Sequence, residues 1–118
     1  MSVDVTKTGG YEATITWEPG DDPHGRLARA VETDELAYVL EALGAGETEY
    51  DDERALEAAR YTTRIARLLE ARAAVRVVEL RDKRGMSWRQ IAAAVHNNPD
   101  MQSTVRRQYD AGRRQIGH

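Results

Sequence analysis

The stretch MSWRQIAAAVHNNPDMQSTVRRQY, residues 86–109, decides the fold of the C-terminal third of this chain. Ser87 and Gln90 have the S-x-x-Q spacing of a capping box, in which each side chain bonds the backbone N–H of the other residue. Met86 before the cap and Ile91 four places after it have the spacing of a hydrophobic staple. We therefore expect a helix that starts after Ser87 and turns these residues inward: Trp88, Ile91, Ala92 and Val95.

A second helix is expected after a short turn. The segment HNNP, residues 96–99, stops the first helix, and Asn98 followed by Pro99 is a cap and first-turn pair for the next one. The apolar residues of this second helix recur every four positions and predict its buried side: Met101, Val105 and Tyr109. Two short helices joined in this way are the elements of a helix-turn-helix.

The opposite side of the second helix carries side chains that suit a DNA duplex. Arginine can bind guanine edges with two hydrogen bonds, glutamine can bind adenine, and arginine and serine can bind phosphates. Residues near the start of such a helix reach deepest into the major groove. We assign base contacts to Gln102, Ser103 and Arg106, and contacts with the DNA backbone to Arg89, Arg107, Arg113 and Arg114.

The same stretch carries a family resemblance. Residues 85–109, GMSWRQIAAAVHNNPDMQSTVRRQY, resemble bacterial helix-turn-helix DNA-binding regulators of the homeodomain-like and sigma-factor region 4-like type, with Trp88, Ile91 and Ala92 matching their W-x-x-I-A first helix. The sequence departs from the family at the turn, where HNNPD, residues 96–100, stands in place of a glycine, an apolar residue and a serine. The resemblance implies a transcription regulator that binds double-stranded DNA.

A long helical segment precedes this stretch. From Asp52 to Arg84 the sequence has no glycine or proline, and Gly85 is suited to the left-handed residue that ends a helix. The apolar residues of this helix suit either an intramolecular core or a dimer contact: Tyr61, Ile65, Leu68, Leu69 and Val75. We expect the helix, over residues 51–84, to connect an N-terminal module to the helix-turn-helix segment at 85–118.

The N-terminal module, residues 1–50, is expected to hold a β-hairpin and a helix. Residues 1–10 are polar and end in two glycines, which suggests a loose tail, while residues 11–18 alternate apolar and polar side chains as a strand does. Residues 26–32 suit either a returning strand, which would make the hairpin, or the start of a helix. Residues 33–44 predict a helix capped by Thr33, closed by Gly44, and carrying an apolar stripe of Leu36, Val39, Leu40 and Leu43. The expected fold is mainly α-helical with a small N-terminal β-hairpin.

The charges of the two halves differ in sign. Residues 1–58 hold four basic and fifteen acidic side chains, a net charge of −11, whereas residues 59–118 hold thirteen basic and five acidic ones, a net charge of +8. The basic half indicates a polyanionic partner, and the acidic half suits either dimerisation or the binding of a basic protein. A homodimer is expected because a single helix-turn-helix contacts little DNA.

Composition excludes several other classes of protein. The chain of 118 residues has no cysteine, so disulfides and thiolate metal sites are ruled out. No cofactor is expected, and no catalytic trio of nucleophile, base and orienting residue can be assembled from these residues. No apolar run is long enough for a membrane span and the first residues do not read as a secretory signal, which makes the cytoplasm the default location.

Two alternatives to a DNA-binding regulator come from the same residues. One is a protein-interaction module, an antitoxin or an adaptor, whose acidic N-terminal half binds a basic protein and whose C-terminal helices serve as a scaffold. The other is a helical hairpin that only completes a core, with its arginines solvated on the surface.

Overall fold

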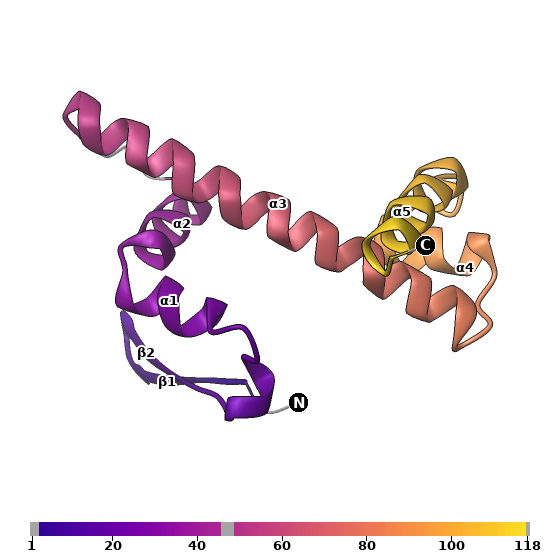
Figure 1. Ribbon diagram of the computed structural model, residues 1–118, viewed down its shortest axis with the longest axis horizontal. Helices are drawn as coiled ribbons and strands as arrows, with labels where there is room; N and C mark the ends of the chain where they lie inside the picture. Colours follow the sequence, from indigo (N-terminus) through magenta and orange to yellow (C-terminus); the bar gives the residue numbers. More distant parts are fainter. Residues whose placement is uncertain (1–2, 46–48, 118) are drawn as a thin grey trace. The chain divides into compact units, whose positions relative to one another are not determined.

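The computed structural model describes residues 3–45 and 49–117, which form a mainly helical chain with an antiparallel hairpin near the N-terminus (Figure 1). The expected fold class is confirmed. The chain divides into two compact units, residues 1–62 and 63–118, and the boundary falls inside the long helix α3. Among the described residues, no helix is both long and apolar enough to cross a bilayer.

The hairpin pairs β1, Asp4–Gly9, with β2, Glu12–Thr16. Val5 lies opposite Ile15 and Thr6 opposite Thr14, and the register shifts between Lys7 and Gly9. The strand expected from the alternation at residues 11–18 is confirmed. The loose tail expected over residues 1–10 is wrong for the described part, because residues 4–9 supply the other strand and threonine and valine favour extended backbone.

Residues 26–32 form helix α1, Arg26–Glu32, so the returning strand that was one of the two expectations for this segment is wrong. The cause lies just upstream. The Asp22 carboxylate accepts hydrogen bonds from the backbone N–H groups of Leu27 and Ala28 at 2.9 and 3.0 Å, which satisfies donors that the first turn of a helix leaves free. These bonds, that from Ala28 foremost, hold the pKa of Asp22 below its usual value.

Helix α2, Glu35–Gly44, begins one residue later than expected, with Asp34 rather than Thr33 at the N-cap position, although the Thr33 hydroxyl still accepts a hydrogen bond from the Glu35 N–H at 3.3 Å. It ends one residue later than expected, because Ala45 rather than Gly44 adopts the left-handed conformation, with φ at 55°. The buried side also differs. Tyr38 is buried, whereas Leu40 and Leu43 of the expected stripe are 54% and 76% exposed.

Tyr38 is the centre of the N-terminal unit. Its ring stacks on Tyr61 at 5.9 Å and meets the edge of Tyr50 at 5.7 Å, and its hydroxyl donates to the Glu57 carboxylate at 3.4 Å. Burial, more than the neighbouring carboxylates, raises the pKa of Tyr38. An aromatic ring with a satisfied hydroxyl covers more apolar area than a leucine does, which explains why this side of α2 turns inward.

Helix α3, Asp52–Asp82, confirms the long helix, and Gly85 follows it in the left-handed conformation with φ at 64°. Its buried residues, Ala74, Val77 and Val78, all lie in the part that belongs to the C-terminal unit. Of the residues that suited a core or a dimer contact, Leu69 is exposed and the others are half-buried: Tyr61, Ile65, Leu68 and Val75.

Helices α4, Trp88–Val95, and α5, Gln102–Gln115, pack on each other and on α3. Val77, Ile91, Ala92 and Val105 form a buried cluster, against which these half-buried side chains pack: Leu80, Met86, Trp88, Met101 and Tyr109. The buried sides expected for both helices are confirmed with one exception. Val95 was expected inside and is 42% exposed.

The capping box of α4 is confirmed in both directions. The Gln90 N–H donates to the Ser87 hydroxyl at 3.1 Å, and the Ser87 N–H donates to the Gln90 side-chain oxygen at 2.9 Å. We predict that Ser87→Ala lowers the free energy of unfolding by about 1 kcal/mol in a urea titration. Ser103→Ala, at an exposed site inside α5, is the control and should change stability by less than about 0.5 kcal/mol. Equal losses in the two variants would contradict the capping role.

Candidate nucleic-acid interface

The turn between α4 and α5 fixes where α5 begins. Asn97 adopts a left-handed conformation with φ at 54°, and the Asn98 side-chain oxygen accepts from the Asp100 N–H at 2.9 Å. Pro99 and Asp100 therefore form a turn, and α5 starts at Gln102. The start expected at Asn98 and Pro99 is wrong, because the Asn98 side chain closes this turn and does not cap the helix.

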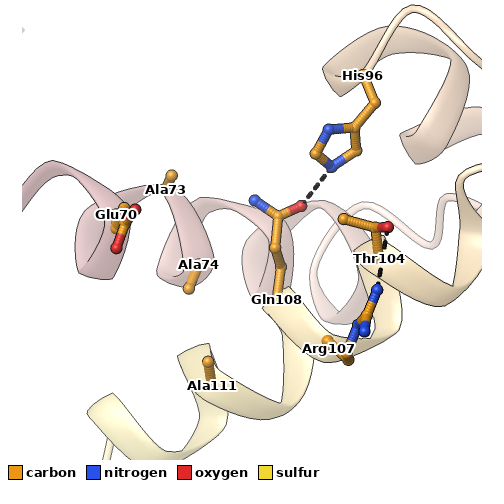
Figure 2. A pocket seen from close by; sticks show the side chains of 8 residues that line it. All are labelled: Glu70, Ala73, Ala74, His96, Thr104, Arg107, Gln108 and Ala111. Atoms are coloured by element: carbon orange, nitrogen blue, oxygen red, sulfur yellow. Dashed lines mark hydrogen bonds between the residues drawn. The ribbon is translucent and has the colours of Figure 1, made fainter. Parts of the chain in front are cut away.

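The turn is also tied to the middle of α5. A ring nitrogen of His96, Nε2, lies 2.7 Å from the Gln108 side-chain oxygen, and Figure 2 shows the imidazole pointing from the turn toward Gln108. This hydrogen bond joins residues twelve positions apart in sequence. It gives His96 a role in placing α5 that sequence reasoning, which assigned it only to the turn, did not predict.

The Asp82 carboxylate fastens α5 to the end of α3. It accepts a hydrogen bond from the Tyr109 hydroxyl at 2.7 Å and an ion-paired one from the Arg113 guanidinium at 3.1 Å. The hydrogen bond to Asp82 is the main reason that the pKa of Tyr109 lies above its usual value. Both contacts hold one side of α5, so the opposite side is presented in a fixed orientation.

We predict a pH dependence from this contact. Because the pKa of Tyr109 is higher in the folded than in the unfolded chain, its stabilising effect is complete below about pH 10 and is lost as the pH rises through the folded value. Urea titrations between pH 8 and 11 should show a smaller alkaline loss of stability in Tyr109→Phe than in the parent. Tyr11→Phe changes a fully exposed residue and should follow the parent. An alkaline loss in Tyr109→Phe that equals the parent's would contradict this role of the hydroxyl.

The outward side of α5 holds most of the residues expected to touch DNA. Ser103, Arg106, Arg107 and Arg114 are exposed, and Gln102 at the start of the helix is half-buried. Arg113 is half-buried in its ion pair with Asp82, and Arg89 on α4 is exposed with its guanidinium 3.8 Å from the Asp100 carboxylate. Six of the seven assigned residues thus lie on α5, and only Arg89 lies on α4. Arg113 and Arg89 each have an acidic neighbour.

Trp88 is a platform for two of the arginines. The Arg81 guanidinium lies 4.4 Å from the Trp88 ring centroid and that of Arg106 lies 5.5 Å from it, while Tyr109 meets the ring at 5.2 Å edge-on. Cations are attracted to the face of an indole, and such contacts restrict a long side chain without removing its charge. Arg106 is therefore held beside the start of α4. The sequence assigned Trp88 only to the core, since the pairing with Arg106 requires the tertiary fold.

A groove runs along the other flank of α5, between α5 and α3. It has a volume of about 440 Å³, and Figure 2 shows Ala73 and Ala74 on α3 across from Ala111 on α5. Arg107 also lines it, with a guanidinium nitrogen donating to the Thr104 hydroxyl at 3.4 Å. Thr104 and Gln108 thus belong to the flank of the helix, which separates them from the outward side that carries Ser103 and Arg114.

The C-terminal unit has a strong positive charge. Residues 63–118 hold twelve basic and five acidic side chains, a net charge of +7. Lys83 and Arg84, which follow α3, are exposed and are two of these twelve basic residues. Asp110 is the only acidic residue within α5. The surface around α5 is therefore suited to attract a polyanion.

Metal-ligand clusters and similarity to known proteins were the two other possible sources of functional information. Within residues 3–45 and 49–117, no cluster of three or more histidine, aspartate or glutamate side chains could hold a metal ion. Comparisons with protein-family models, curated proteins and solved structures found no match to this chain. The geometry and charge of the C-terminal unit are thus the basis for a functional proposal.

Proposed function

We propose that the protein is a cytoplasmic transcription regulator that binds double-stranded DNA sequence-specifically by placing α5 in the major groove. The observation that carries this proposal is the division of α5 into two sides. Val105 and Gly112 are buried on one side, while Ser103, Arg106 and Arg107 are exposed on the other. A helix of this kind, carried by a second short helix and a tight turn, is the element that helix-turn-helix proteins insert between the DNA strands.

The assignment of roles follows from position along α5. Gln102, Ser103 and Arg106 lie in the first five residues of the helix, which is the part that reaches base edges in this docking mode. Arg107 and Arg114 lie on the same outward side and suit phosphate oxygens, as does Arg89 at the start of α4. Arg113 can reach a phosphate while it stays close to Asp82, which would orient its guanidinium.

The charge distribution supports the same docking direction. The C-terminal unit has a net charge of +7, and residues 1–62, with five basic and fifteen acidic side chains, have a net charge of −10. DNA would attract the first unit and repel the second. This difference favours encounters through α5 and also predicts that binding weakens steeply with salt.

Dimerisation belongs to the proposal, because a single helix-turn-helix binds DNA weakly. Two copies would place two α5 helices on half-sites about one helical turn, 34–36 Å, apart. The preferred DNA site should therefore have two-fold symmetry.

A salt titration and a selection experiment test the proposal. Fluorescence anisotropy with labelled duplex DNA should give a slope of log affinity against log salt of about −3.6 per subunit, for four phosphate contacts. Selection of bound sequences from random duplex DNA should enrich a site with two-fold symmetry. A slope near zero, together with no enriched sequence, would overturn the proposal.

A further inference from the structure

The β-hairpin is the least covered element of the N-terminal unit. Every residue of β1 is exposed, and in β2 only Ile15 is half-buried. Val5, opposite Ile15, is 69% exposed. A hairpin of two strands is only marginally stable in water unless further strands or a helix complete it. The hairpin thus has the properties of a sheet that is completed by further strands or by packing against another element.

The two free edges of this sheet differ in how well they are protected. The sheet consists of β1 and β2 within the described residues, so each strand has one edge without a neighbouring strand. β1 contains Asp4 and Lys7, and its register with β2 shifts after Lys7. Charged side chains and bulges are the devices that prevent edge-to-edge pairing. The extra residue at the register shift, Thr8, lies on β1, whereas β2 has consecutive paired residues and one charge, Glu12, at its first position. Its edge is therefore the one open to another strand.

The sequence of β2 is complementary to itself. An antiparallel pair with a two-fold axis at Thr14 places Ala13 opposite the partner's Ile15 and Glu12 opposite the partner's Thr16. Because side chains alternate between faces, this register joins apolar with apolar residues on one face and polar with polar residues on the other. The combined sheet would have four strands, and β1 with its charges would form both outer edges and stop further growth.

The local charge favours a second copy of this chain as the occupant. Residues 1–17 hold one basic and two acidic side chains, a net charge of −1, whereas residues 18–62 hold four basic and thirteen acidic ones, a net charge of −9. Two copies that met through α1, α2 or the start of α3 would bring these carboxylates together. The hairpin is the part of the N-terminal unit where two copies meet with the least repulsion.

We infer that the protein dimerises by antiparallel pairing of β2 with β2 of a second copy, centred on Thr14. The inference rests on the proposed function in one respect, since it names the contact that would join the two DNA-binding units. It is an isologous interface, in which the same surface serves both subunits.

Charge substitutions at two cross-strand partners test the inference. Thr14 and Thr6 are paired in the hairpin and both exposed, so Thr14→Glu and Thr6→Glu make the same change on the same face. At the two-fold axis, glutamates at position 14 would lie about 5 Å apart, whereas those at position 6 would be three strand spacings, about 14 Å, apart. The second distance exceeds the screening length of about 8 Å at physiological salt.

The molar mass without DNA is measured by light scattering across a micromolar concentration series. The parent and Thr6→Glu should reach twice the chain mass of 13.2 kDa, and Thr14→Glu should have a dimer dissociation constant at least about tenfold higher. A mixture of Thr14→Glu with Thr14→Lys should recover a dimer containing one copy of each, as seen by native mass spectrometry. Circular dichroism checks that helix content is unchanged.

Three outcomes would overturn the inference: a monomeric parent, equal masses for Thr14→Glu and Thr6→Glu, or no mixed dimer of the glutamate and lysine variants. If the β2 edge instead binds a different protein, the purified parent would be monomeric, which is the first of these outcomes. Because no DNA is present in these measurements, they are independent of the salt titration. A failed dimer contact is thus distinguished from failed DNA binding.

Discussion

Gly112→Ala is expected to destabilise the C-terminal unit by about 1–3 kcal/mol, because the new methyl group would overpack the contact between α5 and α3. A Cβ atom at position 112 would collide with the backbone carbonyl oxygen of Ala74 and would lie 2.7 Å from the Val78 side chain. Backbone atoms of α3 cannot move aside as a flexible side chain can. Urea unfolding followed by tryptophan fluorescence, in a Trp17→Phe background that leaves Trp88 as the single tryptophan, should show the loss.

Gly44→Ala is the matched control for this prediction. Gly44 is also helical, as the last residue of α2, and nothing lies within 4 Å of the position that its Cβ would take. Alanine there should leave stability unchanged or raise it by up to about 1 kcal/mol, because glycine loses more backbone entropy on folding. If Gly112→Ala proved as stable as the parent, the close approach of α5 to α3 would be wrong.

The double variant Arg106→Ala/Arg107→Ala should have the largest effect on DNA binding. An arginine that contacts a base is expected to contribute about 1–3 kcal/mol to the binding free energy. An arginine that contacts a phosphate is expected to contribute about −0.9 to the slope of log affinity against log salt. Affinity for an enriched site should therefore fall at least about tenfold. The slope of log affinity against log salt should become shallower by about 0.9, for the one phosphate contact assigned to Arg107.

Arg72→Ala/Arg76→Ala removes the same charge from the same unit and serves as the control. Both arginines are exposed on α3, and Arg76 is ion-paired with Glu79 at 3.1 Å. This variant should lose little affinity, because only the general positive potential of the unit changes. Equal losses in the two double variants would show that α5 is not the contacting helix.

The C-terminal helices were predictable because their determinants lie close together in sequence. Ser87 and Gln90 bond each other's backbone across three positions, and Gly85 ends the preceding helix through its own φ angle. The N-terminal residues were less predictable. Whether residues 4–9 form a strand depends on pairing with β2, and whether residues 26–32 form a helix depends on the side chain of Asp22.

The candidate interface shows the same limit. Helical periodicity was enough to predict that Ser103, Arg106 and Arg107 point outward, since this follows from the burial of Val105. The contacts of Asp82 with Tyr109 and Arg113 join positions 27 and 31 residues apart. Contacts between residues so far apart cannot be predicted from a local sequence pattern. The platform that Trp88 makes for Arg106 likewise depends on how α4 and α5 cross.

Nuclear magnetic resonance of the full chain with a duplex carrying the enriched site tests the central claim most directly. We predict that the largest amide and arginine side-chain shifts on addition of DNA occur in α5 between Gln102 and Arg107, with smaller ones at Arg89. Residues 4–44 should shift little at a protein concentration where the oligomeric state does not change. Shifts confined to residues 4–44, or none in α5 at low salt, would contradict a recognition role for this helix.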